Sequence, residues 1–143
     1  MELALQQAQA AAARGEVPVG AVLLGPDGAV LAQAGNQVEA DRDASAHAEL
    51  LVMRAGAQRL GSPRLVGCSL FVTLEPCAMC AGAIVGFRVG RVVFGAYDPK
   101  GGGVEHGARV FAAPGCLHQP EVVGGVRETE CGDVLRAFFQ ARR

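Results

Sequence analysis

Two cysteines stand three positions apart, directly after a proline: Pro76, Cys77 and Cys80. Proline fits the first helical position, where its missing N–H has no partner to lose, so we predict a helix that opens at Pro76. The partial positive charge of a helix N-terminus favours the thiolate, which is the form that binds metal. His47 and Glu49 lie upstream. One histidine and two cysteines supply three zinc ligands, and three protein ligands plus a water describe a catalytic zinc.

The alternatives are a redox pair and a closed structural zinc site. A redox C-x-x-C pair has no need of the upstream His47 and Glu49. A structural site needs a fourth protein ligand, and the remaining candidates lie at no finger-like spacing from the pair. These candidates are Cys68, Cys116, Cys131, His106 and His118. Spacing and ligand chemistry therefore favour a hydrolytic zinc, and the order H-x-E followed by P-C-x-x-C matches the signature of zinc deaminases.

Length and composition narrow the class of protein. A chain of 143 residues suggests one domain, 1–143, with a real core, and 50% apolar residues disfavour disorder. The net charge is −1, and because nucleic-acid binders usually carry a basic surplus, this argues mildly against a large RNA footprint. An odd number of cysteines suits a reducing compartment. Since we find neither a signal-peptide pattern nor an apolar run of about 18–20 residues, we expect a cytoplasmic protein away from membranes.

The elements that must position the metal motif can be read from hydrophobic patterning. Strands separated by helices favour a mixed sheet with helices on both faces. We therefore predict an α/β fold, a three-layer α/β/α sandwich around a central mixed five-stranded sheet. The expected helices are 2–14, 46–60, 77–86 and 130–143, and the expected strands are 17–24, 29–34, 68–74, 89–96 and 121–126.

The orientation of the predicted helix over 46–60 is constrained by its two functional residues. His47 and Glu49 are two positions apart, which is about 200° around a helix axis, so they cannot share a lateral face. Both can reach one site only if this helix points its N-terminus at the site. In the helix after Pro76, by contrast, Cys77 and Cys80 are three positions apart, so both sulfurs fall in the first turn on one face.

Several longer runs carry a resemblance to a known family. They are V-P-V-G-A-V at 17–22, Asn36, A-H-A-E at 46–49, T-L-E-P-C-A-M-C-A-G-A at 73–83 and G-R-V-V-F-G-A at 90–96, followed by Asp98 and Lys100. The metal motif is shared with cytosine, cytidine and guanine deaminases. The longer runs resemble the bacterial tRNA-specific adenosine deaminases of the cytidine deaminase-like superfamily. The resemblance spans about residues 16–139 and implies the cytidine deaminase-like fold.

The resemblance also implies roles at the reacting base. Zinc would be held by His47, Cys77 and Cys80, and Glu49 would shuttle protons. A flipped adenine would be hydrogen-bonded by Asn36 and seated by the backbone near Ala48. The reaction would convert the wobble adenosine of an arginine tRNA to inosine.

Further positions match residues that meet the tRNA in this family. Asp98 and Lys100 match a loop that contacts the anticodon strand, and His118 matches a histidine of the same rim. The implied partner is the anticodon stem-loop, bound across two subunits of a homodimer. Four positions depart from the family pattern: Ala44 stands for a usual proline, Ser45 for threonine, Tyr97 for arginine and Leu117 for asparagine. The loop at 101–107 also lacks the usual Gly-Ser step.

Two other functions stay open on the sequence. A deaminase of a free base or nucleoside, such as guanine, cytosine or cytidine, would use the same zinc core, and the weak net charge suits a small substrate. A non-catalytic, zinc-stabilised RNA-binding subunit is the second alternative. Glu49 argues against it, because a subunit without activity needs no proton shuttle.

Overall fold

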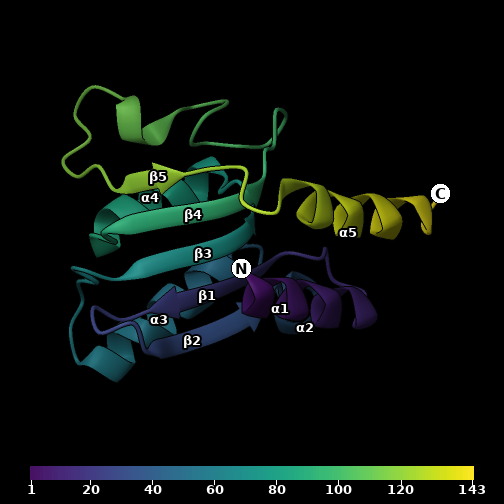
Figure 1. Cartoon of the computed structure of the whole chain (residues 1–143), viewed down its shortest axis with the longest axis horizontal. Helices are drawn as coiled ribbons and strands as arrows, with labels where there is room; N and C mark the ends of the chain where they lie inside the picture. The colour runs from purple at the N-terminus through teal and green to yellow at the C-terminus, as the bar shows by residue number, and fades with distance from the viewer.

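The computed structural model describes residues 1–143 and is built on a five-stranded mixed sheet (Figure 1). The strands are β1 (Gly20–Leu24), β2 (Val30–Gly35), β3 (Ser69–Leu74), β4 (Arg91–Ala96) and β5 (Glu121–Val123), and their spatial order is β2-β1-β3-β4-β5. Strand β1 pairs antiparallel with β2 and β3, whereas β3, β4 and β5 run parallel. The mixed sheet predicted from the sequence is confirmed.

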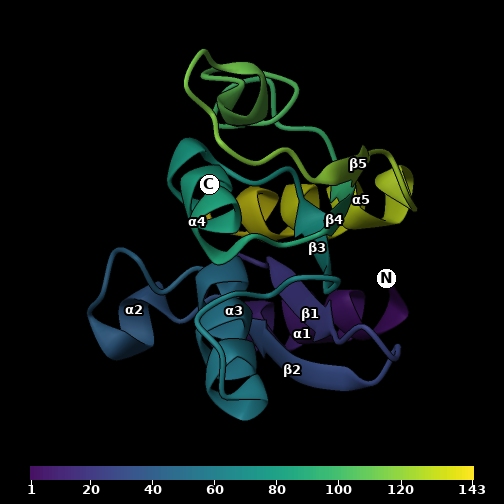
Figure 2. The same ribbon diagram turned by 90° about the vertical axis from the view of Figure 1, so that its left-hand side faces the viewer.

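Helices cover both faces of this sheet. Helices α1 (Glu2–Ala13) and α5 (Glu128–Gln140) pack on one face, and α3 (Ala48–Leu60) and α4 (Ala78–Phe87) lie on the other (Figures 1 and 2). The short helix α2 (Val38–Asp41) and the 3-10 turn η1 (Val110–Ala112) lie in connections. This is the predicted three-layer α/β/α sandwich. None of the helices is both long enough and apolar enough to cross a membrane.

The main core lies between the sheet and the α3–α4 layer. Its largest fully buried side chains include Leu23, Leu70 and Phe94 from the strands, with Met53 from α3 and Ile84 from α4. Each such side chain contributes roughly 1.5–3 kcal/mol by leaving water. The strands and the helices that carry the metal motif are therefore held by the same buried cluster.

Helix α1 lies unusually close to the first hairpin. A Cβ added to Gly20 would lie 2.0 Å from the Ala4 carbonyl oxygen, and one added to Gly35 would lie 2.6 Å from the Gln7 carbonyl oxygen. Only glycine allows this approach. The Arg14 guanidinium, just after α1, donates to the Asn36 carbonyl at 3.2 Å. The end of α1 is thereby fixed beside the end of β2.

Several predicted boundaries differ from the structure: the helix expected from 46 begins at Ala48, and the strands expected from 17 and 89 begin at Gly20 and Arg91. Another difference lies at the metal motif. Helix α4 begins at Ala78 with Cys77 as its N-cap residue, so Pro76 lies outside the helix rather than at its first position. The Pro76 carbonyl accepts the Gly103 N–H at 2.8 Å. This bond joins the turn between β3 and α4 to the loop that follows β4. Cys77 is extended, with ψ 174°, and the helix starts only after it.

Candidate active site

His47 and Cys77 occupy equivalent places at two helix starts. His47 is the N-cap residue of α3, and Cys77 is the N-cap residue of α4. Neither side chain makes a capping hydrogen bond. Both helix N-termini point at the carboxyl end of β3, where ligands gather in open α/β sheets. The expected convergence of the two helices on one site is confirmed in this geometry.

The three predicted zinc ligands come together there. The His47 Nδ1 atom lies 3.7 Å from the Cys77 Sγ and 3.5 Å from the Cys80 Sγ, and all three donor atoms lie within 4.8 Å of one another. A tetrahedral zinc with ordinary Zn–N and Zn–S lengths would set the N···S separation at about 3.6 Å. The two N···S separations therefore fit one zinc ion bound by the imidazole and both sulfurs.

The two thiols of this group differ in the direction of their pKa shifts. Hydrogen bonds from Cys80 and from the His47 ring lower the pKa of the Cys77 thiol to about 4, despite the opposing effect of burial. The bond to Cys77, together with burial, raises the pKa of the Cys80 thiol. The hydrogen bonds to Cys77 therefore favour its thiolate, which is the form that binds metal.

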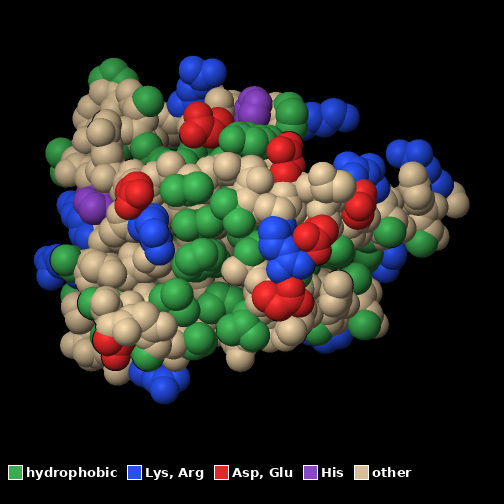
Figure 3. Space-filling model, in the orientation of Figure 1, with side chains coloured by type: hydrophobic (Ala, Val, Ile, Leu, Met, Phe, Trp, Pro, Cys, Tyr) green, Lys and Arg blue, Asp and Glu red, His purple; other side chains and the backbone are tan.

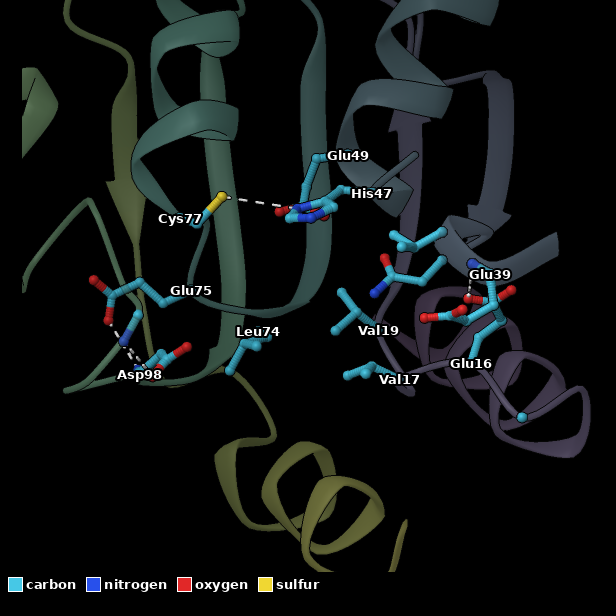
Figure 4. A pocket seen from close by; sticks show the side chains of 14 residues that line it. Glu16, Val17, Val19, Glu39, His47, Glu49, Leu74, Glu75, Cys77 and Asp98 are labelled. Carbon is cyan, nitrogen blue, oxygen red and sulfur yellow. Dashed lines mark hydrogen bonds between the residues drawn. The ribbon is translucent and has the colours of Figure 1, made fainter. Parts of the chain in front are cut away.

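Glu49 lies next to the ligand group and is buried, with 4% of its surface exposed. Burial raises the pKa of its carboxyl above the ordinary glutamate value, and the nearby His47 partly offsets this. A raised pKa makes the carboxylate a stronger base, which suits a group that must accept a proton and return it. In the view of Figure 4 the side chains of Glu49 and His47 overlap, and both line the cavity.

A cavity of about 440 Å³ opens in front of these residues. Its lining includes His47, Glu49, Cys77 and Asn36, the last of which is 8% exposed. The Asn36 Oδ1 accepts the Ala48 N–H at 2.9 Å. This fixes the amide orientation, so the NH₂ group is the part of Asn36 left for a ligand. The Ala48 N–H is already used, and Ala48 acts on the cavity by orienting Asn36.

Comparison with known proteins identifies the family. A family model of the cytidine and deoxycytidylate deaminase zinc-binding region matches residues 1–96. A tRNA-specific adenosine deaminase of Agrobacterium fabrum is 50% identical over 143 residues, which is 100% of this chain and 93% of that protein. The chain belongs to the tRNA-specific adenosine deaminase family.

Solved structures agree with this membership. A structure from work on A-to-I editing by tRNA:A34 deaminases at the wobble position of transfer RNA superposes with a TM-score of 0.92 and 50% identity, covering 94% of this chain and 97% of that one. A guanine deaminase from Nitrosomonas europaea has a TM-score of 0.80 at 21% identity, covering 96% of this chain and 81% of that one. The second likeness shows the fold alone. The cytidine deaminase-like fold expected from the sequence is confirmed.

Two of the residues that the family resemblance expects to contact tRNA, Asp98 and Lys100, lie in the loop after β4. Asp98 lines the cavity, and its Oδ1 accepts the N–H groups of Lys100 at 3.2 Å and Gly101 at 2.9 Å. This turn places Lys100 on the surface, where it is exposed. Asp98 therefore shapes the loop that presents Lys100.

The structure does not bring His118 to the cavity. Its Nε2 lies 2.6 Å from the Val89 carbonyl oxygen, just before β4 starts, whereas the cavity lies at the other end of that strand. Tyr97 also faces elsewhere, because its ring packs edge-on against Phe94 at 5.1 Å between centroids. Leu117 is 83% exposed. The expected RNA contact of His118 stays a prediction.

The sequence reasoning missed Glu75. This residue lines the cavity beside Cys77 and is 2% exposed, yet it carries a charge. Burial raises its pKa, but hydrogen bonds from Asp98, His106 and Glu105 together outweigh burial, so the pKa lies below the ordinary value. A glutamate at the end of an apolar strand was the available signal, because buried carboxylates are rare unless paired.

Proposed function

We propose that this chain is a zinc-dependent deaminase that converts adenosine to inosine at the wobble position of a tRNA. The observation that carries the proposal is the group formed by His47, Cys77 and Cys80, with Glu49 beside it at the base of a cavity. The 50% identity to a tRNA-specific adenosine deaminase over the full chain supports the choice of substrate. Residues 1–143 would act as one deaminase domain, since a single sheet and its main core support the whole site.

The chemistry assigns one role to the metal and one to the carboxylate. Zinc bound by His47, Cys77 and Cys80 supplies a Lewis acid that lowers the pKa of a water to about 7. Glu49 accepts a proton from the attacking water and passes it to ring nitrogen N1 of adenine. It then takes the second proton of that water from the hydroxyl group now on C6 and delivers it to the amine, which departs as ammonia. Water and adenosine give inosine and ammonia, and Glu49 ends in its starting state.

Asn36 supplies recognition of the base. Because its Oδ1 accepts the Ala48 N–H, its NH₂ group is presented as a donor toward the cavity. A donor at this position pairs with an acceptor nitrogen of the purine ring. The amide thus helps to hold the flipped base while Glu49 acts on its other edge.

The anticodon stem-loop is the proposed partner. Asp98 and Lys100 would contact its strand beside the flipped nucleotide. Acidic and basic side chains are interspersed on the face seen in Figure 3, with no extended basic patch there. Because the whole chain carries a net charge of −1, we expect the RNA contact to be local to the mouth of the cavity. The family pattern implies arginine tRNA as the substrate.

We also propose a homodimer in the cytoplasm. The apolar side chains of Met79 and Leu117 are 43% and 83% exposed near α4, which supports a partner surface there. All five cysteines are free thiols, which supports a reducing compartment. Light scattering of the purified protein measures the mass of the assembly, and a monomer at micromolar concentration would contradict the dimer.

One experiment separates the candidate functions. The purified protein is incubated with an arginine tRNA anticodon stem-loop and, separately, with adenosine, cytidine, cytosine and guanine. Inosine from the stem-loop alone supports the proposal. Ammonia from a free base or nucleoside alone assigns the small-substrate function, and no product from any of them assigns a binding role. The Glu49→Gln protein is the matched control for contaminating deaminases.

A further inference from the structure

Glu75 carries an unusual number of hydrogen bonds for a buried side chain. Its Oε1 accepts the Asp98 N–H at 3.0 Å and lies 2.8 Å from the His106 Nδ1. Its Oε2 accepts the N–H groups of Val104, Glu105 and His106, at 3.2, 2.9 and 3.1 Å. The side chain itself has no exposed surface. One carboxylate therefore gathers both ends of the segment 98–106, which we term the rim loop.

The rim loop lies directly on the turn that carries the first cysteine. The Gly103 N–H donates to the Pro76 carbonyl at 2.8 Å. A Cβ added to Gly103 would lie 2.6 Å from the Ala78 nitrogen, so a side chain would push the loop away. A Cβ added to Gly102 would lie 2.4 Å from the Glu75 Oε2. The loop is thus held at one distance from the metal-binding turn.

The same loop forms one wall of the cavity. Asp98 and Gly101 line it, and Figure 4 shows Glu75 and Asp98 joined by a hydrogen bond on the side opposite Val17 and Glu16. If the Glu75 side chain is replaced by one with fewer acceptor oxygens, some backbone donors of the loop lose their acceptor. Asp98 and Lys100 would then move relative to Cys77.

We propose that Glu75 is a positioning residue that sets the cavity wall at 98–101 against the metal-binding turn and so controls substrate affinity. This inference rests on the proposed function, because it gives the rim loop the task of holding RNA. Glu75 takes no part in proton transfer, since its carboxylate is fully occupied by five donors. Its removal therefore weakens substrate binding more than the chemical step.

The test uses Glu75→Gln, which keeps the length of the side chain but loses the charge and one acceptor oxygen. The amide NH₂ would face backbone N–H groups that also need an acceptor. We expect hydrogen exchange of the amides at 104–106 to become about ten-fold faster or more. The KM for the stem-loop should rise about ten-fold, kcat should change by less than about three-fold, and zinc content should stay near one equivalent.

Two further variants keep the test decisive. His106→Ala removes one donor and leaves the Glu75 carboxylate in place. It can therefore replace Glu75→Gln in the test if that variant does not fold. We expect it to raise the KM for the stem-loop by roughly two- to five-fold. Glu130→Gln is the matched control, because Glu130 is exposed and pairs with Arg127 away from the cavity.

A fall in kcat at unchanged KM, in proportion to lost folded protein or zinc, would overturn the proposal, since it would mean general destabilisation. Unchanged amide exchange in Glu75→Gln would also overturn it. If Glu75→Gln does not fold, an unaltered KM in His106→Ala would overturn the proposal. If the wild-type protein makes no inosine from the stem-loop, the proposed function fails, and the exchange measurement alone still decides whether Glu75 holds the loop.

Discussion

Asn36 has two tasks in this structure, and they can be separated by substitution. Its Oδ1 accepts the buried Ala48 N–H at 2.9 Å, at the start of α3, and its NH₂ group is left for the substrate. Asn36→Ala removes both functions. Asn36→Asp keeps an oxygen for Ala48 and replaces the donor by a second acceptor.

The expected magnitudes follow from these contacts. In Asn36→Ala the Ala48 N–H loses its partner, which costs about 1–3 kcal/mol of the free energy of unfolding. In Asn36→Asp the bond to Ala48 stays, and a negative charge at a helix N-terminus is favourable by about 0.3–1 kcal/mol. The aspartate protein should therefore keep a free energy of unfolding close to that of the wild type. Its kcat/KM should fall about 10- to 100-fold, because a donor to the base is lost and an acceptor faces an acceptor.

Denaturant unfolding measures the first effect, and inosine formation from the anticodon stem-loop measures the second. Gln33→Glu is the matched control, because Gln33 is exposed on β2 and also exchanges an amide for a carboxylate. Two results would refute the reasoning. One is wild-type activity in Asn36→Asp, and the other is equal stability of the alanine and aspartate proteins.

Two other predictions concern the reacting centre and the wall beside it. Glu49→Gln should keep zinc near one equivalent while deamination falls about 10²- to 10⁴-fold, and retention of most activity in a product assay would remove Glu49 from the mechanism. Gly103→Ala should lower both the melting temperature and kcat/KM, because its Cβ would lie 2.6 Å from the Ala78 nitrogen. Gly82→Ala is its control: a Cβ there meets nothing within 4 Å, and alanine favours the helix by about 1 kcal/mol, so a loss equal to that of Gly103→Ala would contradict the steric argument.

The metal-ligand group and the fold could both be predicted from local sequence patterns. Patterning predicted the sheet and the four long helices, since each element carries its own periodicity. The ligand group followed from residue types whose chemistry leaves few alternatives. Even the helix direction followed, because His47 and Glu49 can meet only at a helix start.

Contacts between distant segments escaped the same reasoning. The bond from Ala48 to Asn36 and the five donors to Glu75 join residues that no local pattern relates. The position of Pro76 outside α4 was missed for the same reason, because its carbonyl is held by the N–H of Gly103 from a distant loop. Residues that shape the cavity are thus harder to predict than those that carry its chemistry.

The N-cap positions of α3 and α4 suggest a trade between helix stability and metal binding. Serine at an N-cap stabilises a helix by about 0.5–2 kcal/mol over residues that do not cap, yet His47 and Cys77 make no capping bond. Cys77→Ser should therefore reverse the order of stability with zinc. Under a chelator the serine protein should melt above the wild type, because its hydroxyl can cap α4. With zinc present it should melt below, because one of three ligands is lost and metal binding contributes to folding. Melting curves with and without zinc test this, and a serine protein that is less stable in both conditions would show that Cys77 serves α4 as well as the metal.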